Sequence, residues 1–256
     1  MGLFKTSNPA LGQNTFSDFA RNQYSGDLID ASARMTLSGT VNKTGILLLC
    51  TIATSAWIWH SFMQTEDLVL AGPALLLGIF GGFIFSLITI FKKEWAPVTA
   101  PVYALLEGLV LGGLSAFFEL RYPGIAFQAV ALTFGTLFAM LMLYKSGLIK
   151  VTDKFRMGVV AATGGIALFY VLRMLLGFFG FRFSILSNSG PVSIVISLII
   201  VGVAALNLVL DFDFVERGVS YGAPKYMEWY AAFGIMVTLV WLYLEMLRLL
   251  AKSRRR

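Results

Sequence analysis

The sequence predicts an all-α integral membrane protein, a polytopic helical bundle with about seven transmembrane helices. Of its 256 residues, 57% are hydrophobic and 13% are charged, whereas soluble domains carry about 25% charged residues because water must solvate their surface. The apolar residues also form long continuous runs, such as residues 194–210, without the alternation typical of membrane β-strands. Together these observations favour helices that span a bilayer.

Seven apolar windows are long enough to cross a membrane, because a spanning helix needs about 20 mostly apolar residues for a hydrocarbon core of about 30 Å. In chain order, the windows are residues 44–63, 68–91, 97–118, 125–144, 157–179, 190–210 and 229–250. Six charged segments separate consecutive windows. In chain order, these breaks are residues 66–67, 92–94, 119–121, 145–156, 182–188 and 211–228. We therefore expect three regions: a polar N-terminal segment (1–40), a transmembrane domain (41–250) and a basic tail (251–256).

Small residues recur at helical spacing in the second and third windows. Gly78 and Gly82 are four residues apart, as are Gly108 and Gly112. Small residues at this spacing let membrane helices approach each other closely. The spacing favours a compact bundle.

Lysine and arginine counts predict a cytoplasmic N-terminus. The residues before the first window and the second, fourth and sixth breaks together hold twelve of these residues, whereas the other breaks hold two. Cytoplasmic loops carry the excess of Lys and Arg. Seven full crossings would then place Arg254, Arg255 and Arg256 on the opposite side. The alternative is that one apolar segment enters the membrane and returns on the same side.

Ionisable residues at membrane depth are costly and commonly functional. Glu107 lies in the middle of the third window, about 15 Å from either end at the helical rise. Arg173 is the one basic residue well inside a window. It could pair with Glu107 or Asp211, or it could be a structural or interfacial arginine.

The end of the sixth window contains a second group of polar residues. Asn207 and Asp211 are four residues apart and share a helical face, whereas Asp213 points about 160° away from Asp211. Both aspartates can face one groove only if the helix unwinds there. In the last window, Glu245 could pair with Arg248 three residues on, either as an interfacial ion pair or as part of an ion pathway.

Several function classes find no support in the sequence. One histidine and one cysteine cannot build a metal site of recognised spacing, so the sequence identifies no metal ligands. Phosphate-binding loops, dinucleotide fingerprints and nucleophile elbows are also missing. We expect neither an enzyme nor a bound cofactor. The net charge of +6 predicts contact with anionic lipid in the bilayer, with no nucleic-acid partner.

Particular runs resemble a known family. The run Leu208-Val-Leu-Asp211-Phe-Asp213-Phe-Val-Glu216, followed by Tyr226-Met-Glu-Trp229 and a final apolar helix, resembles the end of Bax inhibitor 1-like membrane proteins. The runs Asn42-Lys-Thr-Gly45, Lys93-Glu-Trp-Ala-Pro97 and Tyr103-Ala-Leu-Leu-Glu107-Gly are similar to a bacterial branch of that family. The likeness covers roughly residues 40–250. It implies an inner-membrane bundle of seven helices with the last helix central. It also implies a cation leak, chiefly for Ca²⁺, that pH regulates through two aspartates on the sixth and seventh helices.

In this resemblance the first aspartate corresponds to Asp211, and Asp213 is the alternative position. Counting without gaps places Met236 at the second position, whereas a gapped alignment brings Glu245 there. If Met236 is the match, Glu107 or Glu228 would have to supply the second acid. Two buried carboxylates in one site repel each other and titrate in two separated steps, and carboxylate oxygens are ligands that Ca²⁺ prefers.

Two functional hypotheses follow from these residues and the resemblance. The first is a pH-sensitive cation leak channel or ion-homeostasis protein with Asp211 as its titrating centre. The second is a non-transporting membrane regulator that binds a protease or stress complex as its membrane partner, through the polar N-terminal segment and the basic tail.

Overall fold

The computed structural model describes residues 33–65, 68–179 and 190–254. These residues form seven helices that are long and apolar enough to cross a membrane. The helices are α2 (Leu37–Thr65), α3 (Leu68–Phe91), α4 (Ala96–Arg121), α5 (Ile125–Lys145), α6 (Asp153–Phe178), α7 (Pro191–Ser220) and α8 (Met227–Arg254), with a short 3₁₀ turn, η3 (Lys93–Trp95), before α4. The prediction of an all-α polytopic membrane bundle is confirmed, and the chain is an integral membrane protein.

One predicted boundary is wrong. The sequence predicts that the sixth span ends at Asp211, but α7 continues unbroken to Ser220. On one face of this extension Phe214 and Val215 are buried. On another face Asp213 pairs with Arg217 one turn later at 2.9 Å. Because the charged side chains find partners beside the helix, they do not end it.

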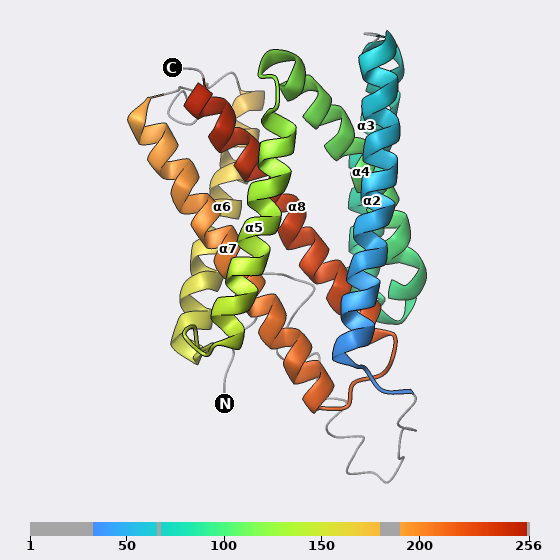
Figure 1. The fold of residues 1–256 in the computed structure, drawn as a ribbon, viewed down its shortest axis with the longest axis vertical. Coiled ribbons are helices and arrows are strands. Elements are labelled where there is room, and N and C mark those ends of the chain that lie inside the picture. Colours follow the sequence, from blue (N-terminus) through green and yellow to red (C-terminus); the bar gives the residue numbers. More distant parts are fainter. Residues whose placement is uncertain (1–32, 66–67, 180–189, 255–256) are drawn as a thin grey trace.

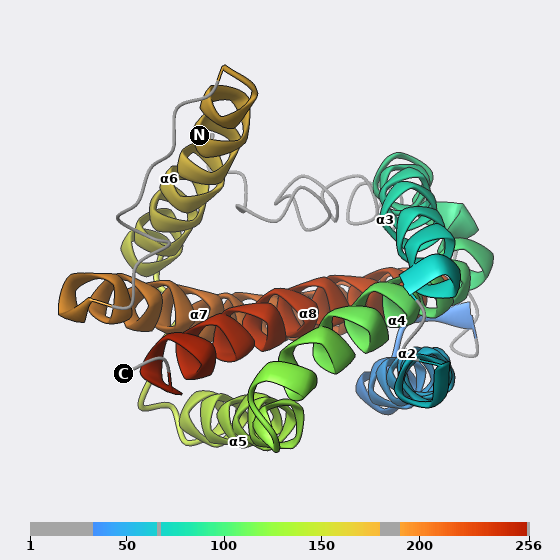
Figure 2. The ribbon, with the colours of Figure 1, turned by 90° about the horizontal axis from the view of Figure 1, so that it is seen from above.

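Helix α8 is the central element of the bundle. It crosses between a group formed by α2, α3 and α4 and a group formed by α5, α6 and α7 (Figures 1 and 2), and it contacts α2, α4, α5 and α7. Of its apolar window 61% is buried inside the protein, against 6% for α6. The expected central position of the last helix is therefore confirmed.

Glycines on α4 allow close packing against α2. A Cβ atom on Gly112 would lie 2.5 Å from the carbonyl oxygen of Ser55. Side chains of α2 also bond to the backbone of α4: the Ser55 hydroxyl donates to the Gly108 carbonyl at 2.8 Å, and the Thr51 hydroxyl donates to the Ala104 carbonyl at 3.1 Å. The small residues of the third span thus allow the close approach that their spacing predicts.

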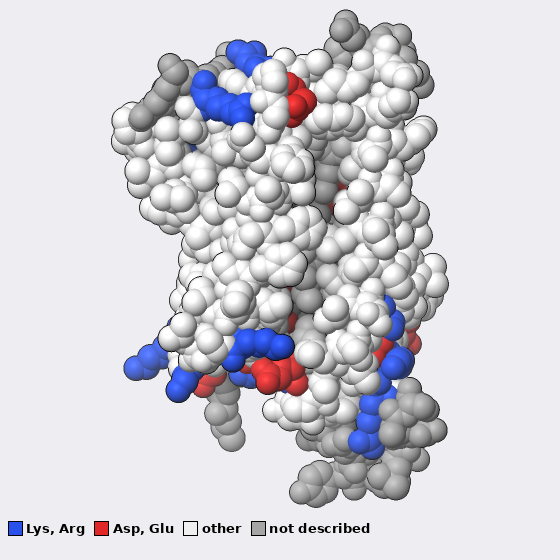
Figure 3. Space-filling view, viewed as in Figure 1, with Lys and Arg blue, Asp and Glu red and all other residues white. Residues whose placement is uncertain are grey.

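Charged side chains gather near the two ends of the molecule. The face in Figure 3 shows lysines, arginines and acids above and below a broad band that carries almost no charge. Large apolar side chains such as Phe80, Phe127 and Phe138 are exposed. This distribution is typical of a protein whose middle faces lipid.

The start of α2 is attached to the turn between α7 and α8. The amide of Met35 donates to the carbonyl of Ala223 at 2.6 Å, and the amide of Lys225 donates to the carbonyl of Ala33 at 2.8 Å. An isolated antiparallel bridge joins Arg34 to Pro224. This attachment brings two distant parts of the chain together at one end of the bundle.

Candidate functional site

Asp211 lies in the interior between α7 and the central α8. It is nine residues before the end of α7, about 13 Å along the helix. Its side chain is 2% exposed. The hydroxyl of Thr238 on α8 lies beside it and donates to the Gly234 carbonyl of its own helix at 3.3 Å. Among the described residues, the oxygen Oδ2 has no partner. The site is therefore a buried carboxyl with a hydroxyl beside it.

Asp213 faces a different neighbour. Its carboxylate accepts from Arg156 of α6 at 2.6 Å and from Arg217 of its own helix at 2.9 Å. Arg156 is itself buried, with a side chain 4% exposed. The two aspartates thus point to separate elements, as the helical rotation between them requires.

Asn207 joins α7 to α6. Its side-chain amide donates to the hydroxyl of Thr163 and to the carbonyl of Val203, both at 2.8 Å. Asn207 is buried one turn before Asp211. It holds α6 against α7 at this level.

Met236 occupies the ungapped position of the second acid. It is fully buried, and its Sδ accepts from the Thr51 hydroxyl at 3.8 Å. The residue on α8 that meets Asp211 is Thr238, two residues further on. No ion pair found in the described part of the chain involves Asp211.

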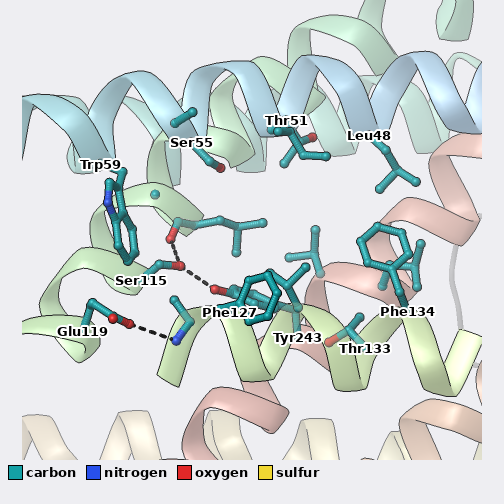
Figure 4. A pocket seen from close by; sticks show the side chains of 18 of the residues that line it. Leu48, Thr51, Ser55, Trp59, Ser115, Glu119, Phe127, Thr133, Phe134 and Tyr243 are labelled. Atoms are coloured by element: carbon teal, nitrogen blue, oxygen red, sulfur yellow. Dashed lines mark hydrogen bonds between the residues drawn. The ribbon is translucent and has the colours of Figure 1, made fainter. Parts of the chain in front are cut away.

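Met236 lines a cavity of about 680 Å³ between α2, α4, α5 and α8. Its walls are mostly apolar, and Figure 4 shows the hydroxyls of Ser115 and Tyr243 directed toward each other on one side of it, 2.6 Å apart. Glu119 at its margin accepts from the backbone amides of Gly124 and Ala126 at the start of α5. This cavity corresponds to the recess between α2 and α5 in Figure 3. Its shape and polarity suit an apolar occupant.

Glu245 lies in a different cavity, of about 380 Å³, between α4, α6 and α8. Its Oε1 accepts from Arg248 at 2.6 Å and from the hydroxyl of Tyr170 at 2.8 Å. Arg173 lines the same cavity. The structure therefore brings Arg173 and Glu245 together.

Glu107 faces α3. Its carboxyl is hydrogen-bonded to Tyr103, one turn earlier on α4. One of its oxygens lies 3.3 Å from the position that a Cβ on Gly82 of α3 would take. Glu107 thus belongs to the α3–α4 contact, whereas Asp211 belongs to the α7–α8 contact.

Glu228, named from the sequence as a possible second acid, forms an anchor that the sequence did not predict. It is fully buried at the start of α8. It accepts from the Thr36 amide and hydroxyl at 2.9 and 2.8 Å, from Lys43 at 2.5 Å and from Lys225 at 3.2 Å. Thr36 and Lys43 precede it by 192 and 185 residues, so no local spacing signals this contact.

Within residues 33–65, 68–179 and 190–254, no group of three or more His, Cys, Asp or Glu residues lies together as metal ligands would. The acids described above are instead distributed over separate helix contacts: Asp211 at α7–α8, Glu107 at α3–α4, Glu245 at α6–α8 and Glu228 at α2–α8.

Comparison with known proteins gives one match. A family model described as Bax inhibitor 1 like matches residues 8–255, nearly the whole chain. No match was found among curated proteins or among solved structures. The match covers all of the sequence runs whose resemblance to this family was noted above. The chain belongs to the Bax inhibitor 1-like family of membrane proteins.

Proposed function

We propose that this chain is a pH-sensitive cation leak protein of the cell inner membrane, chiefly for Ca²⁺, with Asp211 as its titrating centre. One observation carries the proposal: Asp211 is buried at depth against the central helix, and its Oδ2 lacks a partner among the described residues. A buried charge without a cation is costly. The proton on this carboxyl therefore affects how α7 and α8 fit together.

The proposed gate is the α7–α8 contact. Because Asp211 is 2% exposed, a cation can reach its oxygens only if α7 and α8 separate at this level. Loss of the proton leaves a charge that a hydroxyl alone stabilises poorly, and such a charge favours a conformation with water or a cation beside it. Carboxylate oxygens are ligands of the kind that Ca²⁺ prefers. The proton and the cation thus compete for one group.

This centre differs from the acid pair that the family resemblance implies. With Met236 at the ungapped second position and Thr238 against Asp211, a single carboxyl takes the role of the pair. We expect one titration step in the leak, because two steps require two strongly interacting groups.

The proposed orientation has the N-terminus in the cytoplasm. The helix order places the connections η3, α5–α6 and α7–α8 at the same end of the bundle as the start of α2 (Figure 1). These connections carry most of the lysines and arginines near the spans, and such residues are enriched on the cytoplasmic side.

A flux measurement tests the proposal. The purified full chain is reconstituted into Ca²⁺-loaded vesicles, and Ca²⁺ efflux is followed across a range of pH. The wild type should leak with a single pH transition, and Asp211→Asn should abolish that transition. Asp153→Asn is the matched control, because this acid is 86% exposed, and it should keep the wild-type profile. An Asp211→Asn profile that matches the wild type would overturn the proposal.

The alternative, a non-transporting regulator of a protease or stress complex, makes the opposite prediction. Vesicles containing the wild-type chain would then show no more efflux than empty vesicles at any pH. Under this alternative, removal of residues 1–32 and of the basic tail would abolish the cellular phenotype, because the partner complex binds there.

A further inference from the structure

The cavity between α4, α6 and α8 carries an excess of positive charge. We call it the basic cavity and define it by Arg121, Tyr170, Arg173, Glu245, Arg248 and Lys252. Among these lining residues, four are cationic and one is an acid. We infer that the basic cavity binds a phosphate-bearing anion, a phospholipid headgroup or a free phosphate compound. This inference is independent of the leak proposal.

The acid in the cavity does not balance the cations. Glu245 is held by Arg248 at 2.6 Å and by the Tyr170 hydroxyl at 2.8 Å. Lys252 donates to the neutral hydroxyl of Ser197 at 2.6 Å; it is attracted by Glu245 and repelled by Arg248 and Arg173, so one acid faces several cations. Like charges this close repel each other in a partly buried site. An anion between them would remove that repulsion.

Phosphate matches the donors that the cavity offers. Arginine guanidinium groups bind phosphate through two parallel hydrogen bonds, and lysine adds a point charge. Arg248 also stacks over the ring of Tyr170 at 5.4 Å, which holds its guanidinium in one orientation. The cavity therefore combines several phosphate donors with a fixed geometry.

The position of the basic cavity is at headgroup depth. Arg121 is the last residue of α4, and Lys252 lies in the last turn of α8. Lysines and arginines mark this upper end of the molecule in Figure 3. Cations at this depth can pair with the phosphate of a lipid headgroup.

The cavity is also accessible from the side. Helix α6 packs mainly against α7, and 6% of its apolar window is buried. Tyr170 joins it to Glu245 and Arg248 on α8 through side chains alone. A headgroup can therefore enter laterally between α6 and its neighbours while the acyl chains stay in the bilayer.

Binding to defined probes tests this inference. The full chain in a neutral sugar detergent is titrated with short-chain phosphatidylglycerol, short-chain phosphatidylcholine and inorganic phosphate. Apparent Kd values come from native mass spectrometry, and unfolding temperatures provide a second readout. Phosphatidylglycerol should bind and raise the unfolding temperature. The double variant Arg173→Gln/Lys252→Gln should weaken binding by at least about tenfold, since loss of one charge-assisted bond is worth that much.

Two further variants distinguish binding in the basic cavity from a general effect of the protein's net charge. Arg254 lies on the same helix but donates to the Pro123 carbonyl and to Gln128, outside the basic cavity. The Arg254→Gln variant should therefore bind phosphatidylglycerol like the wild type. Arg121→Gln removes an exposed lining cation and should weaken binding even if the double variant fails to fold.

Each outcome decides the question. Preference for phosphatidylglycerol over both other probes identifies a lipid headgroup as the ligand, and equal binding of inorganic phosphate identifies a free phosphate compound. Binding that is equal for phosphatidylcholine and phosphatidylglycerol, or equal weakening by Arg254→Gln and Arg121→Gln, overturns the inference. So does the failure of all three probes to bind.

Discussion

Asp211 and Asp213 lie two residues apart on α7, about 3 Å apart along its axis, and have contrasting surroundings. In the α7–α8 interior, Asp211 meets a threonine hydroxyl and has one oxygen without a partner among the described residues. In the α6–α7 contact, Asp213 meets two arginines, at 2.6 and 2.9 Å. The same residue type therefore takes two different roles at nearly the same depth.

The contrast shows that the neighbouring helix, more than depth, sets the role of a buried acid. A rotation of about 160° between the two positions directs one carboxyl to α6, which offers Arg156, and the other to α8, which offers Thr238. An ion pair favours a permanent charge and supports the fold. A carboxyl against a hydroxyl can gain or lose a proton without breaking an ion pair, as the proposed gate requires.

The largest expected effect on stability is at Asp213. Asp213→Ala removes the closest carboxylate from Arg156, whose side chain is 4% exposed, and leaves a buried cation. We expect a loss of about 3 kcal/mol in the free energy of unfolding, measured by thermal unfolding in detergent. Asp153→Ala, whose carboxylate lies 3.9 Å from the same arginine but is 86% exposed, should cost less than about 0.5 kcal/mol. Equal losses in the two variants would contradict the contrast.

A smaller effect is expected at Thr238. Thr238→Val keeps the shape of the side chain but removes the hydroxyl that meets Asp211. The expected loss is about 1.5 kcal/mol, because the buried carboxyl loses the polar group beside it. Thr136→Val is the control, since the Thr136 hydroxyl donates to the Leu132 carbonyl of its own helix at 2.8 Å. If both variants unfold at the wild-type temperature, Thr238 does not stabilise Asp211.

The smallest effect is expected at Arg217, the second partner of Asp213. Its side chain is 39% exposed and lies one turn from the aspartate, a geometry worth about 0.5 kcal/mol. Arg217→Gln should therefore lower the unfolding temperature slightly, and the difference should shrink at high salt because salt screens exposed charges. A loss as large as that of Asp213→Ala would mean that Arg217, and not Arg156, holds the aspartate.

Much of the fold could be predicted from the sequence, and the reasons are physical. The length and hydropathy of each apolar window predict a span because the bilayer thickness is constant. The family resemblance, confirmed by the match over residues 8–255, added the central last helix. The end of α7 was missed because the charged residues from Asp211 onward end the apolar window, whereas the helix continues past Asp213, whose carboxylate pairs with Arg156 of α6.

The candidate site could be predicted only in part. The helical period predicts correctly that Asp211 and Asp213 diverge. It does not predict that Arg173 shares a cavity with Glu245, or that Glu107 faces Gly82 on α3. The anchor at Glu228 joins it to residues 192 and 185 positions earlier. Contacts of this kind depend on which helices are neighbours.

The sequence by itself determined that the chain has seven spans, a membrane location and acids at depth. These properties depend on local composition, which the bilayer selects without regard to tertiary contacts. The tertiary structure alone decided which acids meet a cation, a hydroxyl or a glycine. That outcome depends on how each helix is rotated about its axis and on which helix lies beside it, and both are set by packing across the whole bundle.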